Sequence, residues 1–168
     1  MTDIRPIPDV VSRDLFIKGM RQVASSVAVV TTNGKAGRHG ATVSAFSSVS
    51  ADPPQLLVCL RSASRIAAAV SANGVFCLNI LSYRHPYVAE RFSGSHDATV
   101  NDRFEGIDLS HEEEDWVLLK DANAFACSIA DRLVSGTHTI YLGNVLRIQI
   151  SSDDPLTYLQ GRYRQIGQ

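Results

Sequence analysis

The sequence carries almost no net charge, and it has no hydrophobic run long enough to cross a membrane. Lys and Arg number 16 against 17 for Asp and Glu, so the formal net charge is −1. A chain without a positive field is poorly suited to bind nucleic acid or an anionic membrane surface, and we expect neither partner. The longest apolar runs, at 56–60 and 66–70, are far shorter than the roughly 20 residues of a membrane-spanning helix.

Cysteine is too scarce and too scattered for a cross-linked or zinc-bound fold. The 3 cysteines, Cys59, Cys77 and Cys127, form no CxxC pair, and no histidines cluster beside them. An odd number with wide spacing argues against a disulfide framework and against a metal site. Residues 1–14 lack the basic start and apolar core of a signal peptide. We therefore expect buried, reduced thiols in a cytoplasmic protein.

What the sequence does contain is a succession of β-type segments. β-Branched and apolar residues predict strands at 27–32, 41–50, 55–60, 75–81, 124–134 and 139–150. They do not alternate regularly with helices, and neither GxGxxG nor a P-loop occurs, which disfavours a Rossmann fold. The length of 168 residues, 45% of them hydrophobic, predicts one globular domain over 1–168. The pattern indicates a mainly β fold, a closed or Greek-key barrel with a few accessory helices.

Three short helices and one long loop complete the expected order of elements. Ser12 is placed to cap a helix that runs to about residue 25. Ser62 or Ser64 opens a second helix, which Asn73-Gly74 ends. A third is expected over 82–92, with Pro86 near its first turn. The polar, acidic stretch 94–115 predicts a long surface loop.

Two places along the chain have residues suited to bind a ligand. Between residues 34 and 50, a glycine-containing turn precedes small hydroxyl residues whose short side chains leave backbone N–H groups open to a planar ligand or a phosphate. The alternative is an ordinary polar-faced strand. The second place is the helix start at Ser62, Ser64 and Arg65, where free N–H groups suit an anion. The alternative there is simple helix capping.

Several pieces of the chain, in their order and spacing, resemble the short-chain flavin reductase family, with its FMN-binding split barrel. The pieces are LFIKGMRQVASSVAVVTT, HGATVSAFSSVSADPPQLLVCL, FCLNILS followed by AERFSG, GTHTIYLGNVLRI and DPLTYLQGRYRQIG. The likeness is to the reductase components of two-component aromatic monooxygenases. It implies a Greek-key split β-barrel, a homodimer, and a flavin-dependent monooxygenase as partner.

The resemblance also implies which residues hold each nucleotide, and it implies no metal. The flavin, FMN or FAD, is expected at Ala36, Gly37, Arg38, His39, Gly40, Ala41, Thr42, Val43, Ser44, Ser47, Ser48, Val58, Cys59, Ser64, Arg65, Ile66, Arg91 and Phe92. NADH or NADPH is expected at His138, Arg162, Tyr163, Arg164 and Gln165. Two arginines around a tyrosine also suit a pyrophosphate and a stacked ring, although a solvated terminus is the alternative.

The implied reaction is hydride transfer from reduced nicotinamide to oxidised flavin, for which the protein positions two planar rings. Backbone N–H groups near residues 44–48 are the candidates to stabilise negative charge on the flavin. No catalytic triad is expected. Two alternatives stay open: a non-catalytic flavin-binding barrel that acts as a sensor or carrier, and a reductase for another acceptor such as a ferric or corrinoid compound.

Overall fold

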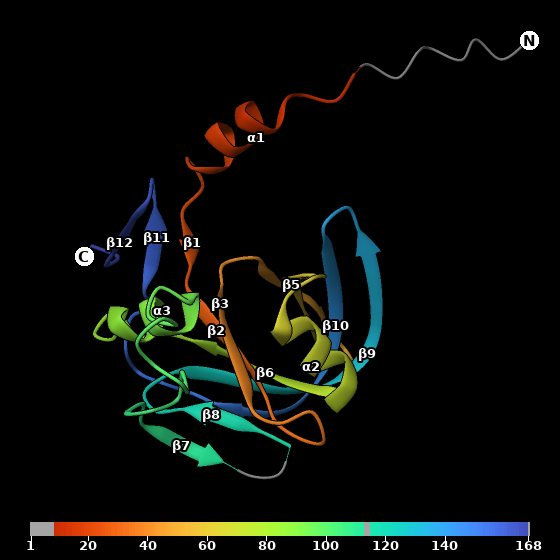
Figure 1. The fold of residues 1–168 in the computed structure, drawn as a ribbon, viewed down its shortest axis with the longest axis vertical. Helices are drawn as coiled ribbons and strands as arrows, with labels where there is room; N and C mark the ends of the chain where they lie inside the picture. The colour runs from red at the N-terminus through yellow and green to blue at the C-terminus, as the bar shows by residue number, and fades with distance from the viewer. Residues whose placement is uncertain (1–8, 113–114, 168) are drawn as a thin grey trace, which may run out of the picture.

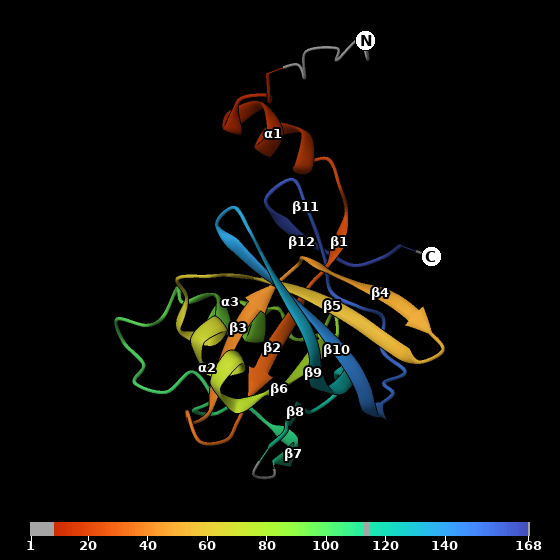
Figure 2. The ribbon, with the colours of Figure 1, turned by 90° about the vertical axis from the view of Figure 1, so that its right-hand side faces the viewer.

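The computed structural model describes residues 9–112 and 115–167, and antiparallel strands dominate it (Figures 1 and 2). The mainly β fold with a few helices that the sequence predicts is confirmed. The strands are β1 Ser25–Ser26, β2 Ala28–Thr32, β3 His39–Val43, β4 Phe46–Ala51, β5 Pro54–Arg61, β6 Val75–Ile80, β7 Leu109–Glu112, β8 Val117–Leu119, β9 Asn123–Ser135, β10 His138–Gln149, β11 Thr157–Leu159 and β12 Arg162–Arg164.

The helices are α1 Arg13–Met20, α2 Arg65–Asn73 and α3 Pro86–Ser93. Ser12 caps α1 as expected, but the helix stops at Met20, because Ser25 and Ser26 pair with β11 instead. Helix α3 begins only at Pro86, whose ring fits the first helical turn. None of the described helices is long and apolar enough to span a bilayer.

The central sheet has seven strands in the order β3-β2-β6-β9-β10-β5-β4. Its two edge strands, β3 and β4, are separated in the chain by only Ser44 and Ala45. The sheet must therefore curl until its edges meet at this corner, which is how a split barrel forms. The expectation of one strand over 41–50 was wrong, because the chain stops pairing with β2 after Val43 and pairs with β5 from Phe46 onward.

Strand β2 is buried on both faces and separates two apolar cores. Ala28 and Val30 face the interior of the barrel, where they join residues of β5, β6 and α2. Val27 and Val29 face a second core, since successive side chains of a strand point to opposite faces. That second core is covered by α3 and by the segment that follows it.

The segment 94–112 is a surface loop as far as Asp108, as its polar composition predicts, but buried apolar residues anchor it to the second core. Phe104 is only 5% exposed and packs edge-on against Phe92, with 4.8 Å between ring centroids. Ile107 is also buried, and Leu109–Glu112 pairs with β8. Single apolar anchors in a polar stretch produce no periodic pattern, so the sequence does not reveal them.

The chain ends in a hairpin, β11–β12, which forms a separate three-stranded sheet with β1. Gln160 and Gly161 make its turn, with φ angles of 52° and 80°. The three cysteines are free, as expected. Cys77 and Cys127 are buried, and burial raises the pKa of each thiol to about 12. Cys59, in contrast, is half-exposed rather than buried.

Candidate functional site

One large cleft, with a volume of about 940 Å³, opens on the barrel between β3, the start of α2 and the segment 97–104. This volume lies within the range of natural ligand sites, roughly 300–1,000 Å³. Its lining residues come from six parts of the chain: Arg38, His39, Gly40, Ala41, Thr42, Val43, Ser44, Ala45, Cys59, Leu60, Arg61, Ser64, Arg65, Ile66, Phe92, Ser93, Asp97, Val100, Asn101, Asp102, Arg103, Phe104 and His138.

The cleft brings together most of the residues expected to hold the flavin. Those that line it are Arg38, His39, Gly40, Ala41, Thr42, Val43, Ser44, Cys59, Ser64, Arg65, Ile66 and Phe92. His138, expected to hold the nicotinamide nucleotide, lines the same cleft. Ligand roles for these residues stay a prediction, because placement in a cleft does not identify what binds there.

Ten of the expected residues do not line the cleft: Ala36, Gly37, Ser47, Ser48, Val58, Arg91, Arg162, Tyr163, Arg164 and Gln165. Val58 is fully buried in the barrel core. Ser47 and Ser48 are exposed on β4, after the chain has crossed to the other sheet edge. Arg91 points to the carbonyl of Glu105 instead, at 3.0 Å.

The C-terminal tract, residues 162–165, lies apart from His138 within one chain. In Figure 1 the β11–β12 hairpin is on the left and the turn between β9 and β10 is on the right. Tyr163 packs against the second core and against Tyr158, with 5.6 Å between ring centroids. The tract is therefore a paired strand of a hairpin and not a tail that folds over the cleft.

The start of α2 is the part of the cleft best suited to an anion. Ser64 Oγ accepts from the N–H of Ala67 at 3.3 Å and donates to the carbonyl of Arg61 at 2.6 Å. The N–H groups of Arg65 and Ile66 have no hydrogen-bond partner in the described part of the chain. Within the same residues, neither Arg61 nor Arg65 forms an ion pair.

His138 lies beside this anion site. It begins β10 and pairs across the sheet with Arg61, the last residue of β5. Its Nδ1 is 2.9 Å from Thr137 Oγ1. The two open N–H groups and the side chains of Arg61 and Arg65 therefore line one end of the cleft, and His138 lines the cleft next to Arg61. Such an end attracts a phosphate both through the helix dipole and through charge.

Strand β3 forms the floor of the cleft, and its polar side chains are already engaged. Thr42 Oγ1 donates to the carbonyl of Ala89 at 2.7 Å, and a ring nitrogen of His39 is 3.2 Å from the carbonyl of Ala36. Cys59 lies on the neighbouring β5, and burial raises the pKa of its thiol. The thiol is therefore protonated, and it offers an uncharged surface to a planar ring.

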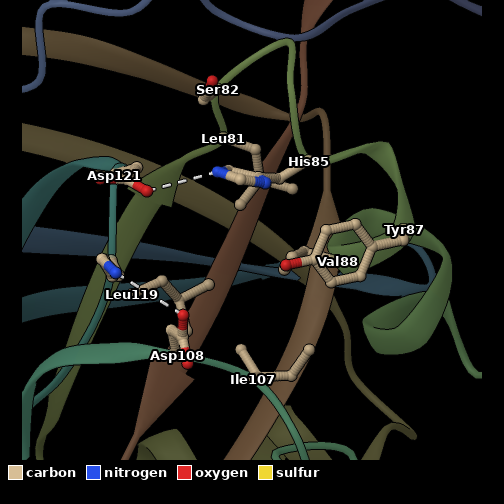
Figure 3. Close-up of a pocket in the computed structure, with 10 residues that line it drawn as sticks. Leu81, Ser82, His85, Tyr87, Val88, Ile107, Asp108, Leu119 and Asp121 are labelled. Carbon is tan, nitrogen blue, oxygen red and sulfur yellow. Dashed lines mark ion pairs between the residues drawn. The ribbon is translucent and has the colours of Figure 1, made fainter.

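A second, much smaller cavity of about 30 Å³ lies beside α3 (Figure 3). Two ion pairs border it, His85 with Asp121 at 3.4 Å and Lys120 with Asp108 at 3.7 Å. It has room for about one water molecule. The large cleft is therefore the candidate site.

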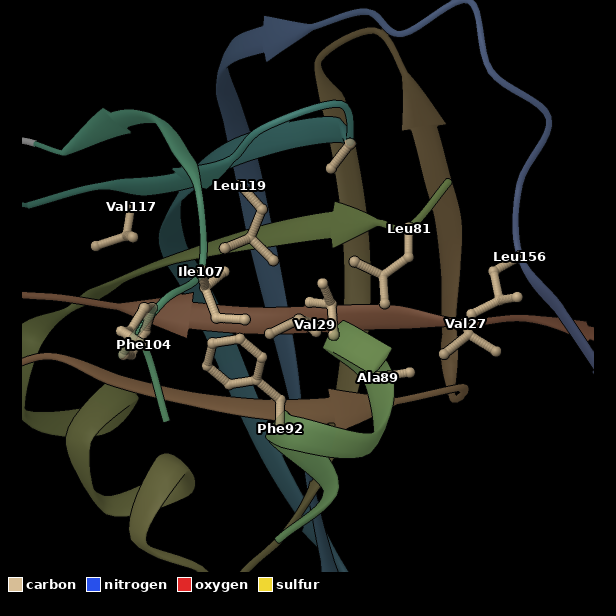
Figure 4. Close-up of a cluster of buried hydrophobic side chains, with 12 residues drawn as sticks. Val27, Val29, Leu81, Ala89, Phe92, Phe104, Ile107, Val117, Leu119 and Leu156 are labelled. Atoms are coloured by element: carbon tan, nitrogen blue, oxygen red, sulfur yellow. The ribbon is translucent and has the colours of Figure 1, made fainter. Parts of the chain in front are cut away.

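The opposite wall of the cleft, residues 97–104, is absent from the residues that the sequence pointed to. Arg103 and Asp97 form a two-bond ion pair there, with N–O distances of 2.8 and 2.6 Å. The hydrogen bonds from Arg103 hold the pKa of the Asp97 carboxyl below its usual value. Figure 4 shows the Phe104 side chain of this wall beside Phe92 in the second core. One arginine among aspartates in a polar stretch is typical of any surface loop, so no local signal marks this segment as part of a site.

Arg38, expected to contact the flavin, is held by this wall instead. Its guanidinium pairs with Asp102 at 2.8 Å and with Glu112, and it lies 4.4 Å from the centre of the Phe104 ring. Both terminal nitrogens of Arg38 therefore donate to carboxylates, of which Asp102 also lines the cleft.

Comparison with known proteins identifies a family and several relatives of this chain. The model of the family described as "Flavin reductase like domain" matches residues 20–167. The FMN reductase (NADH) RutF of Variovorax paradoxus is 34% identical over 161 residues, 95% of this chain and 88% of that protein. The FMN reductase (NADH) RutF of Bradyrhizobium diazoefficiens is 37% identical over 161 residues, with the same shares of the two chains.

Solved structures show the same fold. The flavin reductase PheA2 superposes with a TM-score of 0.84 and 28% identity, over 94% of this chain and all of PheA2 (100%). The NADH:FAD oxidoreductase SgcE6 of Streptomyces globisporus gives a TM-score of 0.85 and 26% identity, over 98% and 100% of the two chains. SgcE6 has also been solved in complex with NAD and FAD fragments. Together with the family match over nearly the whole length, these likenesses confirm the expected resemblance: the chain belongs to the flavin reductase-like family.

Proposed function

We propose that this protein is an NAD(P)H-dependent flavin reductase that supplies reduced flavin to a partner monooxygenase. The observation that carries the proposal is the cleft itself, with open N–H groups and unpaired arginines at one end and the floor of β3 beside them. The relatives named FMN reductase (NADH) and the neighbours named flavin reductase support it.

The residues present fit a flavin nucleotide. The N–H groups of Arg65 and Ile66 and the side chains of Arg61 and Arg65 bind its phosphate. The backbone of β3 and the half-exposed Cys59 offer a flat, uncharged surface to the ring system. When bound, the flavin supplies the hydride acceptor and the reduced nicotinamide supplies the hydride. The protein holds the two rings together and keeps water from between them.

Backbone N–H groups near the flavin ring have a further proposed role, which is to stabilise negative charge on the flavin. The sequence placed them at residues 44–48, but Ser47 and Ser48 lie outside the cleft, which leaves Ser44 and Ala45 at the corner between the sheet edges. The carbonyl of Ala45 accepts from the N–H of Cys59 at 2.9 Å, which fixes this corner. We assign the stabilisation of negative charge on the flavin to the backbone of this corner.

A negative charge introduced at the anion site is expected to weaken flavin binding. Aspartate caps a helix about as well as serine does, so Ser64→Asp keeps α2 while it places a carboxylate beside the phosphate. We expect the dissociation constant for FMN to rise at least about tenfold, or about 1.4 kcal/mol, in a fluorescence titration. The matched control, Ser152→Asp, changes an exposed serine outside the cleft. Equal FMN affinity in both variants would contradict the assignment.

The activity is tested by NADH oxidation with the purified protein at increasing concentrations of free flavin. A reductase that uses flavin as a substrate gives a rate that rises with free FMN or FAD and saturates. A barrel that merely stores or senses flavin gives no turnover at any flavin concentration. The same assay with all four pairs of FMN or FAD and NADH or NADPH establishes which nucleotides the protein uses.

We also propose that the protein is a cytoplasmic homodimer in which residues 1–168 act as one domain. Helix α1 has no buried residue, and it stands away from the barrel in Figures 1 and 2. Leu15, Phe16 and Met20 are each at least half exposed along it. A short isolated helix is marginal in water, so a second copy that covers these apolar residues accounts for α1.

Sedimentation equilibrium at micromolar concentration is expected to give about twice the 18.3 kDa mass of one chain. Phe16→Asp places a charge on the exposed apolar side of α1 and is expected to shift the mass toward one chain. Lys18→Asp, a charge change on the same helix, serves as the control. A mass of 18.3 kDa for the unaltered protein would contradict the homodimer.

A further inference from the structure

Arg103 joins three separate parts of the molecule. One terminal nitrogen donates to the carbonyls of Gly40 on β3 and Phe92 on α3, at 3.1 and 3.0 Å. Its other nitrogens bind both oxygens of Asp97. Its side chain is 30% exposed, so these bonds are partly shielded from water. A planar guanidinium with several fixed donors makes this set of contacts, whereas the single ammonium of a lysine cannot reach them all.

The backbone is packed tightly around this arginine. A Cβ added at Gly94, where φ is +91°, would lie 2.8 Å from an Arg103 nitrogen and 3.2 Å from an Asp97 oxygen. A Cβ added at Gly40 would lie 2.5 Å from the Phe92 ring and 3.2 Å from the Phe104 ring. The absence of a side chain at both glycines therefore leaves space for the Arg103–Asp97 pair and for the rings of Phe92 and Phe104.

Arg38 holds the same segment from its other side. It pairs with Asp102, directly before Arg103, and covers the ring of Phe104, directly after it. The N–H of Phe104 also binds the Asp102 carboxylate, at 2.9 Å. Residues 102–104 are thus fixed by two arginines, while the cleft side of the segment stays open.

This wall stands at the anion end of the cleft. Asp97 and Arg65 lie close enough for the positive charge of Arg65 to contribute to the low pKa of the Asp97 carboxyl. Ser64 and Arg65 on one side and Asp97 to Phe104 on the other border the same cleft. A ligand whose phosphate sits at the start of α2 therefore has this wall beside its phosphate end.

We propose that Arg103 is a positioning residue that holds segment 97–104 as a preformed wall beside the flavin phosphate. The inference rests on the proposed flavin reductase function. All three nitrogens of the Arg103 guanidinium bind protein acceptors, so we assign its effect on the flavin to the wall that it holds in place. Loss of the wall weakens binding of a phosphorylated flavin and leaves the hydride-transfer step of the bound complex unchanged, which raises KM and preserves kcat.

The test compares FMN with riboflavin, which lacks the phosphate, in steady-state NADH oxidation. For Arg103→Gln we expect KM for FMN to rise at least about tenfold, KM for riboflavin to change by less than about threefold, and kcat to stay within about twofold. Arg103→Lys keeps the positive charge but lacks the planar, multi-donor guanidinium, and it is expected to restore only part of the FMN affinity. The matched control is Arg84→Gln, an arginine paired with Asp153 at 3.6 Å outside the cleft.

Gly94→Ala provides a second variant that retains every charge while it displaces the Arg103–Asp97 pair. It is expected to raise KM for FMN in the same selective way. Equal changes for FMN and riboflavin, or full rescue by Arg103→Lys, would overturn the positioning role. If the unaltered protein oxidises no NADH with either flavin, the proposed function fails, and this outcome is distinct from an active protein whose KM is insensitive to Arg103.

Discussion

Replacing Asn79 by alanine is expected to lower the free energy of unfolding by about 3 kcal/mol. Asn79 is fully buried between the second core and the short strand β8. Its amide nitrogen donates to the Val29 carbonyl and to Thr31 Oγ1, both at 3.1 Å, and its oxygen accepts from the N–H of Leu119 at 2.9 Å. Alanine removes the acceptor of the Leu119 N–H and both bonds that the Asn79 amide donates, and it creates a cavity, so these effects act in the same direction.

Urea unfolding followed by circular dichroism measures this loss. The matched control is Asn144→Ala, because the side chain of Asn144 is only half-buried and accepts one hydrogen bond, from Gln55 at 2.8 Å. We expect the control to lower the free energy of unfolding by no more than about 1 kcal/mol. Similar losses in both variants would show that the buried network of Asn79 adds nothing beyond a surface hydrogen bond.

Replacing His138 by alanine is expected to lower kcat/KM for NADH and to leave flavin affinity nearly unchanged. The fall corresponds to a loss of about 1–3 kcal/mol in transition-state stabilisation. His138 lines the cleft from the start of β10, and its ring is fixed by Thr137 Oγ1. We assign it to the nicotinamide side, so its removal takes a contact from NADH alone.

Steady-state kinetics with NADH and a separate flavin titration distinguish the possible roles of His138. His85→Ala is the matched control, since His85 pairs with Asp121 beside the small cavity and lies outside the cleft. Loss of flavin binding with normal NADH kinetics would contradict this assignment and make His138 a contact of the flavin phosphate. Unaltered behaviour in both assays would make it an ordinary surface histidine.

The parts of the fold that the sequence predicts are those with a local cause. Ser64 caps α2 and Gly74, with φ of 78°, ends it, because capping and left-handed residues act within one turn. The strand at 27–32 is also predicted by local sequence, because β-branched residues favour a strand that is buried on both faces. The strand pattern indicated a barrel, and the family resemblance added its split form and most residues of the cleft.

The missed parts depend on contacts between distant residues. The corner at Ser44 and Ala45 separates two strands only because β2 and β5 lie on different sides of the barrel. Arg103 is 63 positions from Gly40 and acquires its role only when β3, α3 and the wall come together. The C-terminal arginines are exposed strand residues within a hairpin, and no local pattern tells this apart from a flexible tail.

Hydrogen–deuterium exchange with and without FMN tests most directly whether this cleft is the flavin site. We expect FMN to slow exchange of the open N–H groups of Arg65 and Ile66 and of the segments 38–45 and 97–104. The β11–β12 hairpin and β4 are expected to exchange at unchanged rates, because they lie outside the cleft. Slower exchange in that hairpin or β4, with no change at the start of α2, would contradict the account.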